Sequence, residues 1–234
     1  MLKYDDVAEK IEHYIHQNQL SAGTQLKNID ALIHQYQVSR STIIKALNKL
    51  ERKGTIYQTQ GSGIFVRQPK KSDYFSFIES HGFTRDLNNM PSTTKILQLD
   101  IIKPDSQLCQ ELQCDPSEDI YFIKRLRYVD NQIHCVEQSY YRKKMIPYIN
   151  TEIASGSIFT YIKEVFNINI GFSDKYFEVN VLNEELAEYL SLPVNSPALF
   201  VNETFYTTAG DIFDFSKICY HFENTQFFLQ SNTK

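Results

Sequence analysis

Residues 37–66 of the chain, QVSRSTIIKALNKLERKGTIYQTQGSGIFV, decide the predicted fold of its first part. Ser39 can cap the start of a helix. The apolar residues that follow recur at helical spacing, as Ile43, Ala46, Leu47 and Leu50. Gly54 stands where a glycine commonly ends a helix, and residues 61–63, Gly-Ser-Gly, are typical of a hairpin turn between two β-rich runs. A helix followed directly by such a hairpin predicts the second half of a winged helix-turn-helix.

Two more helices are predicted ahead of this stretch. The first runs from Asp5 to Gln17 and places its apolar residues on one side, namely Val7, Ile11, Tyr14 and Ile15. The second runs from Asn28 to Gln35. A polar stretch around Pro69, QPKKSD, predicts a linker over residues 69–75. We therefore expect a winged helix-turn-helix over residues 1–68, called the head below, and a second domain over residues 76–234, called the body.

Charge is divided unequally between these two parts. The whole chain has a formal net charge of −4. Residues 1–71 carry eleven Lys and Arg against six Asp and Glu, whereas residues 72–234 carry thirteen against twenty-two. A basic head on an acidic body fits a phosphate-facing domain joined to a domain with another role. The alternative is an accidental segregation of charge between two domains.

The polar residues at the start of the predicted third helix are candidates for contact with DNA, because this end of such a helix enters the major groove. Arg40 can pair with a guanine edge or reach a phosphate, and Lys45 lies about one turn further on. The other candidates can donate to phosphate or let the wing approach the backbone closely, and they are Ser41, Thr42, Gly61, Ser62 and Gly63. The alternative is that these side chains are only solvated.

The head resembles a known group of proteins. The segments LKNIDALIHQYQVSRSTIIKALNKLERKG and GSGIFV are similar to the winged helix-turn-helix of GntR-type bacterial transcription regulators. The resemblance implies binding to a palindromic double-stranded DNA operator as a homodimer. Members usually have Pro-Ser-Glu-Arg where this chain has residues 27–30, Lys-Asn-Ile-Asp, and an arginine where it has Ile44. These departures leave more of the expected contact to Arg40 and Lys45.

The body is predicted to be α+β, a mostly antiparallel sheet with helices on one side. Strands are predicted over residues 94–102, 119–129, 133–141, 167–182, 198–207 and 212–222, with an edge at 227–230. Helices are predicted over residues 105–114, 155–166 and 183–190.

Arg125 and Arg127 are the most informative polar residues of the body. They lie two positions apart on one strand, so both side chains point to the same face. Buried guanidinium groups need an anion, which could be Glu137, Asp214 or the phosphate or carboxylate of a ligand. The alternatives are an internal ion-pair cluster and an exposed face of the sheet. His134 and His221 lie in other strand-like runs and are interpreted as structural residues.

The body also resembles a known domain. The runs IYFIKRLRYVDNQIHCVEQSYY, SGSIFTYI, LNEELAEYLSL and DIFDFSKICYHF are similar to the UTRA effector-binding domain of the HutC subfamily of GntR regulators, whose fold is similar to that of chorismate lyase. The resemblance implies that a phosphosugar is held through its phosphate by Arg125, Arg127, Ser157 and the step Phe83-Thr84. It implies that the sugar hydroxyls contact Glu137, Asp214 and Tyr220. Phe159 stands where some relatives have a tyrosine, so it would alter the wall facing the sugar.

These expectations together predict a transcription regulator, with a repressor of a sugar uptake or catabolism operon, relieved by a phosphorylated sugar, as the leading hypothesis. The alternatives are a different anionic effector, an activator, a DNA-binding protein whose body only dimerises, and an enzyme similar to chorismate lyase. No nucleophile has a matched base at interpretable spacing, so we expect no enzyme.

No cofactor or metal is expected. The four cysteines, Cys109, Cys114, Cys135 and Cys219, show no paired spacing and are expected to be reduced. The chain has no long apolar run and no apolar signal-peptide core at its N-terminus, so we expect a cytoplasmic protein without a membrane partner.

Overall fold

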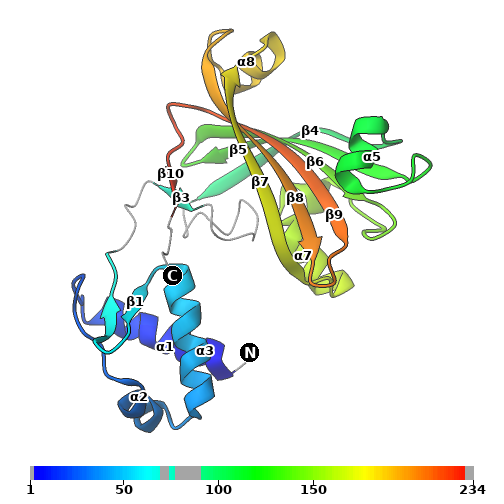
Figure 1. Cartoon of the computed structure of the whole chain (residues 1–234). Helices are drawn as coiled ribbons and strands as arrows, with labels where there is room; N and C mark the ends of the chain where they lie inside the picture. Colours follow the sequence, from blue (N-terminus) through cyan, green and yellow to red (C-terminus); the bar gives the residue numbers. More distant parts are fainter. Residues whose placement is uncertain (1–2, 69–73, 77–90, 230–234) are drawn as a thin grey trace. The chain divides into compact units, whose positions relative to one another are not determined.

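The structure is a computed structural model that describes residues 3–68, 74–76 and 91–229 (Figure 1). Its described residues form two compact units, one with the residues up to Gln68 together with Leu229, and the other running from Tyr74 to Phe228. Tyr74 and Phe75, which the sequence placed in the linker, belong to the second unit. The two units are described separately below.

The head contains three helices and a two-stranded hairpin. Their bounds are α1 (Lys3–Gln17), α2 (Ile29–Tyr36), α3 (Arg40–Lys53), β1 (Ile56–Thr59) and β2 (Gly63–Val66). Ser39 caps α3 by accepting from the backbone N–H of Thr42, and Gly54 ends it with a left-handed φ of 78°. Both predicted ends of this helix are therefore confirmed.

A single hydrophobic core holds the head together. All three helices and the hairpin contribute to it, and its buried side chains include Val7, Ile11, Leu32, Ile43, Leu47, Leu50, Ile56 and Ile64. Tyr14, which the sequence placed on the apolar side of α1, is instead 42% exposed. The core uses one stripe of α3 and leaves the opposite side of that helix free for other contacts.

The body is built on a six-stranded antiparallel sheet with the strand order β4-β5-β6-β9-β8-β7. The strand bounds are β4 (Ser92–Ile102), β5 (Ile120–Val129), β6 (Gln132–Arg142), β7 (Ile170–Val181), β8 (Pro197–Thr207) and β9 (Ile212–Tyr220). The α+β prediction and all six strands are confirmed. A shift in register between Arg127 and Tyr128 lies next to the hairpin that joins β5 and β6.

Helices cover both faces of this sheet, not one face as the sequence predicted. The helix α6 (Thr151–Ser155) and the helix α7 (Ile158–Phe166) pack on the face that carries Tyr121 and Ile123. The helix α5 (Ser106–Leu112) packs near Ile120, and the helix α8 (Glu184–Leu190) packs near Leu126 on the other face (Figure 1). Because side chains alternate along β5, the two sets of helices lie on opposite sides.

The predicted helix over residues 155–166 is interrupted. Helix α6 ends at Ser155, the backbone of Gly156 is extended, and Ser157 caps a new helix by accepting from the N–H of Thr160. The break turns the chain so that α7 begins with its own free amides at Ser157.

The two ends of the body meet in a small parallel pair. The strand β3 (Phe75–Ser76) pairs with the strand β10 (Phe227–Phe228), and the N–H of Phe75 donates to Gln226 O at 2.8 Å. The Phe75 ring is buried and lies edge-on to His134, with ring centres 4.7 Å apart. The first residues of the body are thereby held against its last strand.

Candidate functional site

The third helix of the head presents one polar, exposed side. Arg40, Ser41, Lys45 and Asn48 are exposed there, and Thr42 is partly exposed. The buried residues of α3 lie on the other side of the helix. The structure therefore brings the predicted DNA-contacting residues of α3 together on a single face.

Arg40 forms an ion pair that does not remove it from this face. Its Nη1 lies 2.8 Å from Asp30 Oδ1, and the side chains of Arg40 and Asp30 are 61% and 76% exposed. Such exposed pairs contribute only about 0–1 kcal/mol and are screened by salt, so Arg40 can exchange this partner for a phosphate or a base. Asp30 stands where a cation was expected from the resemblance, and it holds Arg40 near the start of the helix.

Two lysines of α3 have a structural role. Lys49 Nζ lies 2.6 Å from Asp5 Oδ1, and Lys53 Nζ lies 2.7 Å from a carboxylate oxygen of Glu12. Both pairs join α3 to α1 in the head. Lys45, in contrast, is exposed and forms no ion pair within the described ranges, which leaves it available to DNA.

The wing is held by one side chain outside the hairpin. Gln25 Nε2 donates to Ser62 O at 2.9 Å, and the backbone of Gln25 bridges to Phe65. Gly61 and Gly63 have φ angles of +77° and +128°, which residues with a Cβ rarely adopt. Gly61 and Ser62 are exposed, so the tip of the wing is open to a ligand.

Gly63→Ala is expected to weaken DNA binding more than Gly61→Ala. A Cβ at Gly63 would lie 2.6 Å from Gln25 Nε2 and displace it, whereas a Cβ at Gly61 meets nothing within 4 Å. Both variants carry the backbone cost of a positive φ, on the order of 1 kcal/mol, and only the first also loses the Gln25 contact. Electrophoretic mobility shifts of the two variants on one duplex test this, and equal losses would contradict it.

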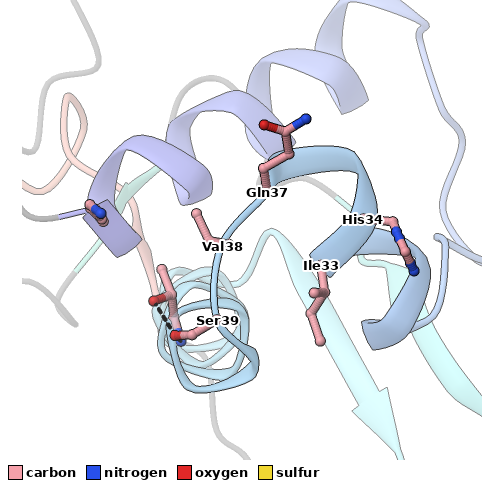
Figure 2. Close-up of a pocket in the computed structure, with 7 residues that line it drawn as sticks. Ile33, His34, Gln37, Val38 and Ser39 are labelled. Carbon is pink, nitrogen blue, oxygen red and sulfur yellow. Dashed lines mark hydrogen bonds between the residues drawn. The ribbon is translucent and has the colours of Figure 1, made fainter.

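A groove of about 530 Å³ lies beside the turn of the helix-turn-helix (Figure 2). It is lined by Lys3, Ile33, His34, Gln37, Val38, Ser39 and Thr42. Two of these lining residues are in contact, because Ser39 Oγ and Thr42 Oγ1 lie 2.8 Å apart. The groove belongs to the head and contains none of the residues predicted to hold an effector.

In the body, Arg125 and Arg127 share one carboxylate. Arg125 Nη2 donates to Glu137 Oε1 at 2.7 Å and Arg127 Nε donates to Glu137 Oε2 at 2.8 Å. The two arginines are only 2% and 4% exposed. Of the three anions considered from the sequence, Glu137 is thus the one that the structure places against both guanidinium groups.

Glu137 is ionised at neutral pH. Burial alone would raise its pKa, but the charges of Arg125 and Arg127 and their hydrogen bonds outweigh burial and lower the pKa to about 2. The same carboxylate accepts from Ser139 Oγ at 3.2 Å. Glu137 therefore links the arginine pair to the polar residues of β6 and β9.

Asp214 lies at the other end of this network. Ser216 Oγ is 2.9 Å from Ser139 Oγ and 3.1 Å from Asp214 Oδ1. Burial raises the pKa of Asp214 well above its usual range, and the charge of Glu137 raises it further. Ser216 Oγ can donate to either neighbour, and burial of the Asp214 carboxyl group favours its neutral form over its charged form. A neutral Asp214 can both donate to and accept from a hydroxyl group.

Asp214→Asn is expected to stabilise the protein at pH 7 and to have little effect near pH 4. Because the folded-state pKa is raised above the ordinary value of 3.8, the folded protein keeps a proton that the unfolded chain releases. Stability is thus lost as the pH rises above 3.8, and asparagine removes this loss. Urea unfolding at both pH values measures the change, with Asp211→Asn, exposed in the same hairpin, as the control. A pH-independent difference would contradict a protonated Asp214.

Arg125 of the arginine pair contacts the helix α6, which directly precedes the start of α7. Arg125 Nη1 donates to Ala154 O at 3.1 Å, and Ser157 follows three positions along the chain. Ser157 Oγ accepts from the N–H of Thr160 at 3.3 Å and lies 2.9 Å from Thr160 Oγ1. The N-terminus of a helix attracts anions through its free amides and its dipole. Arg125 thus contacts α6, and Ser157 begins the helix that follows α6 on the same side of the sheet.

Two other predicted residues lie in packed aromatic clusters. Phe159 is 9% exposed, and its ring lies edge-on to Phe205 with centres 4.7 Å apart. Tyr220 is 8% exposed and lies edge-on to Phe227, also at 4.7 Å. Phe159 is apolar and adds no polar group to the network of Glu137 and Asp214. Phe83 and Thr84 lie outside the described residues.

Sequence reasoning missed three polar partners. Ser139 and Ser216 extend the network, and Thr94 Oγ1 accepts from Arg127 Nη1 at 2.7 Å. Ser139 lies two positions after Glu137, and Ser216 lies two positions after Asp214. The alternation of a strand places each serine on the same face as its acidic neighbour, so this signal was present in the sequence.

His134 and His221 each form a hydrogen bond within the body. The Nδ1 of His134 lies 3.2 Å from Thr225 Oγ1, and burial lowers the pKa of His134 to about 4. His134 O accepts from the N–H of His221 at 2.8 Å. Cys135 and Cys219 are buried free thiols, and Cys109 and Cys114 are partly buried.

Comparison with known proteins identifies both parts of the chain. Residues 3–66 match the family described as bacterial regulatory proteins, gntR family, and residues 88–226 match the UTRA domain. The HTH-type transcriptional regulator YydK of Bacillus subtilis (strain 168) is 46% identical over 233 residues, which cover 100% of this chain and 99% of that protein. The chain belongs to the GntR family. Its UTRA domain fits the HutC subfamily.

Other members of the GntR family show the same organisation. The crystal structure of YydK has a TM-score of 0.88 and 45% identity, and the match covers 99% of this chain and 100% of that chain. The mannosyl-D-glycerate transport/metabolism system repressor MngR of Escherichia coli (strain K12) is 24% identical over 233 residues, 99% of this chain and 96% of that protein. The transcriptional repressor NagR of Bacillus subtilis (strain 168) is 24% identical over 219 residues, 93% of this chain and 89% of that protein.

As a member of the GntR family, the protein is a transcriptional regulator with a helix-turn-helix head and a UTRA body. The two resemblances predicted from the sequence motifs are confirmed. In the part of the chain that the structure describes, no helix combines the length and the apolar character needed to cross a bilayer. The same residues contain no group of three or more His, Cys, Asp or Glu side chains that could hold a metal ion.

Proposed function

We propose that this GntR regulator represses a sugar uptake or catabolism operon and is released from its operator by a phosphorylated sugar. The head would bind a palindromic duplex as part of a homodimer, since paired half-sites require two-fold symmetry. The name of MngR, a repressor of mannosyl-D-glycerate transport and metabolism, supports a sugar-related effector. An activator role, or another anionic effector, remains the alternative.

The observation that carries the effector proposal is a buried donor without an acceptor. Arg125 Nε is buried and has no hydrogen-bond partner among the described residues, although both Nη atoms of this arginine are engaged. Leaving such a donor unsatisfied costs about 1–3 kcal/mol, and more for a charged group. An anionic ligand oxygen would satisfy it and would form a charge-assisted hydrogen bond.

The polar network beside Arg125 suits a ligand that is anionic at one end and hydroxylated at the other. Arg125, Arg127 and the start of α7 supply positive potential for the phosphate. Ser139, Ser216 and Asp214, whose pKa is raised by burial, would supply donors and acceptors for hydroxyl groups. A phosphorylated sugar has both kinds of group, whereas a simple carboxylate has only the first.

Release from DNA requires that the ligand bind one arrangement of the dimer better than the other. An effector shifts the equilibrium between two states only by its difference in affinity for them. Coupling free energies between such sites are typically about 1–3 kcal/mol, which changes DNA affinity by about 5–150-fold. We propose that effector binding in the body favours a state in which the two heads no longer match the half-site spacing.

A thermal-shift screen tests the effector class. The ligands are sugar phosphates, the same sugars without phosphate, inorganic phosphate, phosphonates and phosphorylated amino-acid derivatives. The proposal expects the largest rise in melting temperature with a sugar phosphate and none with its unphosphorylated form. A larger rise with a phosphonate or an amino-acid derivative would identify that class, and not a sugar phosphate, as the effector. No rise with any anion would refute a sensor role for the body.

A further inference from the structure

Ile44 is an exposed apolar residue on the polar side of α3. Its side chain is 40% exposed, and the core of the head uses Ile43, Ala46, Leu47 and Leu50 of this helix instead. Ser41 lies three positions before Ile44, and Lys45 and Asn48 follow it on the exposed side. Since residues three and four apart are neighbours on a helix surface, Ile44 lies among the candidate DNA contacts.

Folding alone gives no reason for an isoleucine at this position. A β-branched side chain loses rotamer freedom in a helix, and alanine, arginine or lysine would each be better helix formers there. A single exposed apolar residue is common on protein surfaces, so exposure by itself is not informative. What makes Ile44 informative is its position at the centre of the side of α3 that carries the candidate DNA contacts.

The major groove offers one apolar group for such a side chain. The base edges there present hydrogen-bond donors and acceptors, and thymine adds its C5-methyl group. We propose that Ile44 contacts the C5-methyl group of a thymine and so selects thymine at one position of each half-site. This inference rests on the DNA-binding half of the proposed function. Arg40 and Lys45, on either side of Ile44 along the helix, would hold α3 against the duplex by their charge.

The test removes the methyl group from the DNA and, separately, the side chain from the protein. Full-length protein selects duplexes from a random pool, and each thymine of the best duplex is then replaced in turn by deoxyuridine. Uracil pairs like thymine but lacks the methyl group. At one position of the half-site, wild-type protein is expected to lose about fourfold in affinity, the value of one buried methylene-sized group. Ile44→Ala is expected to bind both duplexes equally.

Two control variants separate this contact from other effects. Lys45→Ala is expected to weaken binding to both duplexes alike and to reduce the salt dependence, as for a phosphate contact. Tyr14→Ala removes an apolar residue of α1 that is 42% exposed, similar to Ile44. This variant is expected to prefer the thymine duplex over the deoxyuridine duplex as the wild type does. Circular dichroism checks that Ile44→Ala is folded, which is expected because alanine favours the helix.

Each outcome decides the inference. A methyl-dependent loss in the wild type that disappears in Ile44→Ala supports it. A selected duplex on which no deoxyuridine replacement matters, or on which Ile44→Ala still prefers thymine, overturns the role of Ile44 and leaves the DNA-binding proposal standing. Failure of the wild type to enrich any duplex overturns both.

Discussion

Glu137→Gln is expected to lower the free energy of unfolding by about 3–5 kcal/mol, the usual cost of removing one partner from a buried ion pair. The substitution takes away the carboxylate that Arg125 and Arg127 share, and both guanidinium groups are almost completely buried. Burial makes an uncompensated charge expensive, because the protein interior solvates a lone guanidinium group poorly. Urea unfolding at pH 7 measures the loss.

The same variant has a predictable dependence on pH. The pKa of Glu137 is lowered from 4.5 to about 2, so its ion pairs stabilise the folded protein above pH 4.5 and lose this effect as the pH falls toward 2. The difference between wild type and Glu137→Gln should therefore be full at pH 7 and shrink below pH 4.5. Glu185→Gln is the control, because Glu185 is 51% exposed in its pair with Lys124 and should cost less than about 1 kcal/mol. Equal losses for the two variants would contradict the account of the arginine pair.

Arg125→Ala is expected to abolish the response to the effector while leaving DNA binding intact. The substitution removes the buried Nε donor that an anion would satisfy, and Arg125 belongs to the body while the proposed DNA contacts belong to the head. Glu137 keeps Arg127 as its partner, so the remaining carboxylate is not left unpaired. Mobility shifts of the protein–DNA complex with increasing sugar phosphate measure the response.

Lys124→Ala is the matched control for this experiment. Lys124 is the neighbour of Arg125 on β5, but its side chain points to the opposite face and pairs with Glu185 on α8 at 2.5 Å. Its loss should leave the effector response unchanged. Arg125→Lys adds a second test, since lysine keeps the charge but lacks the planar fork, and it should respond only weakly. A normal response from Arg125→Ala would place the effector site elsewhere.

The head could be predicted almost completely from sequence because its signals are local. Ser39, Gly54 and the Gly-Ser-Gly turn each determine the backbone within a few residues, and the structure places a cap, a helix end and a hairpin there. The same local rule placed Arg125 and Arg127 on one face. It also named Glu137 as one of their three candidate partners.

Features that depend on distant contacts could not be predicted in the same way. Helices on both faces of the sheet, and the pairing of Phe75 with Phe227, join segments far apart in the chain. The raised pKa of Asp214 follows from its burial and from the charge of Glu137, and neither is visible in a one-dimensional pattern. Strand alternation places Ser139 with Glu137 and Ser216 with Asp214, but the contact between the two serines depends on the pairing of β6 with β9.

Under the proposed function, an anion bound in the body releases the head from DNA. The most direct measurement is the fluorescence anisotropy of a labelled, selected duplex on wild-type protein during titration with a sugar phosphate and with the same sugar lacking phosphate. We expect the phosphorylated sugar to lower the anisotropy to that of free DNA and the unphosphorylated sugar to have no effect. Two results would contradict this expectation. Either both forms release the DNA alike, or no anionic ligand that the protein binds releases it.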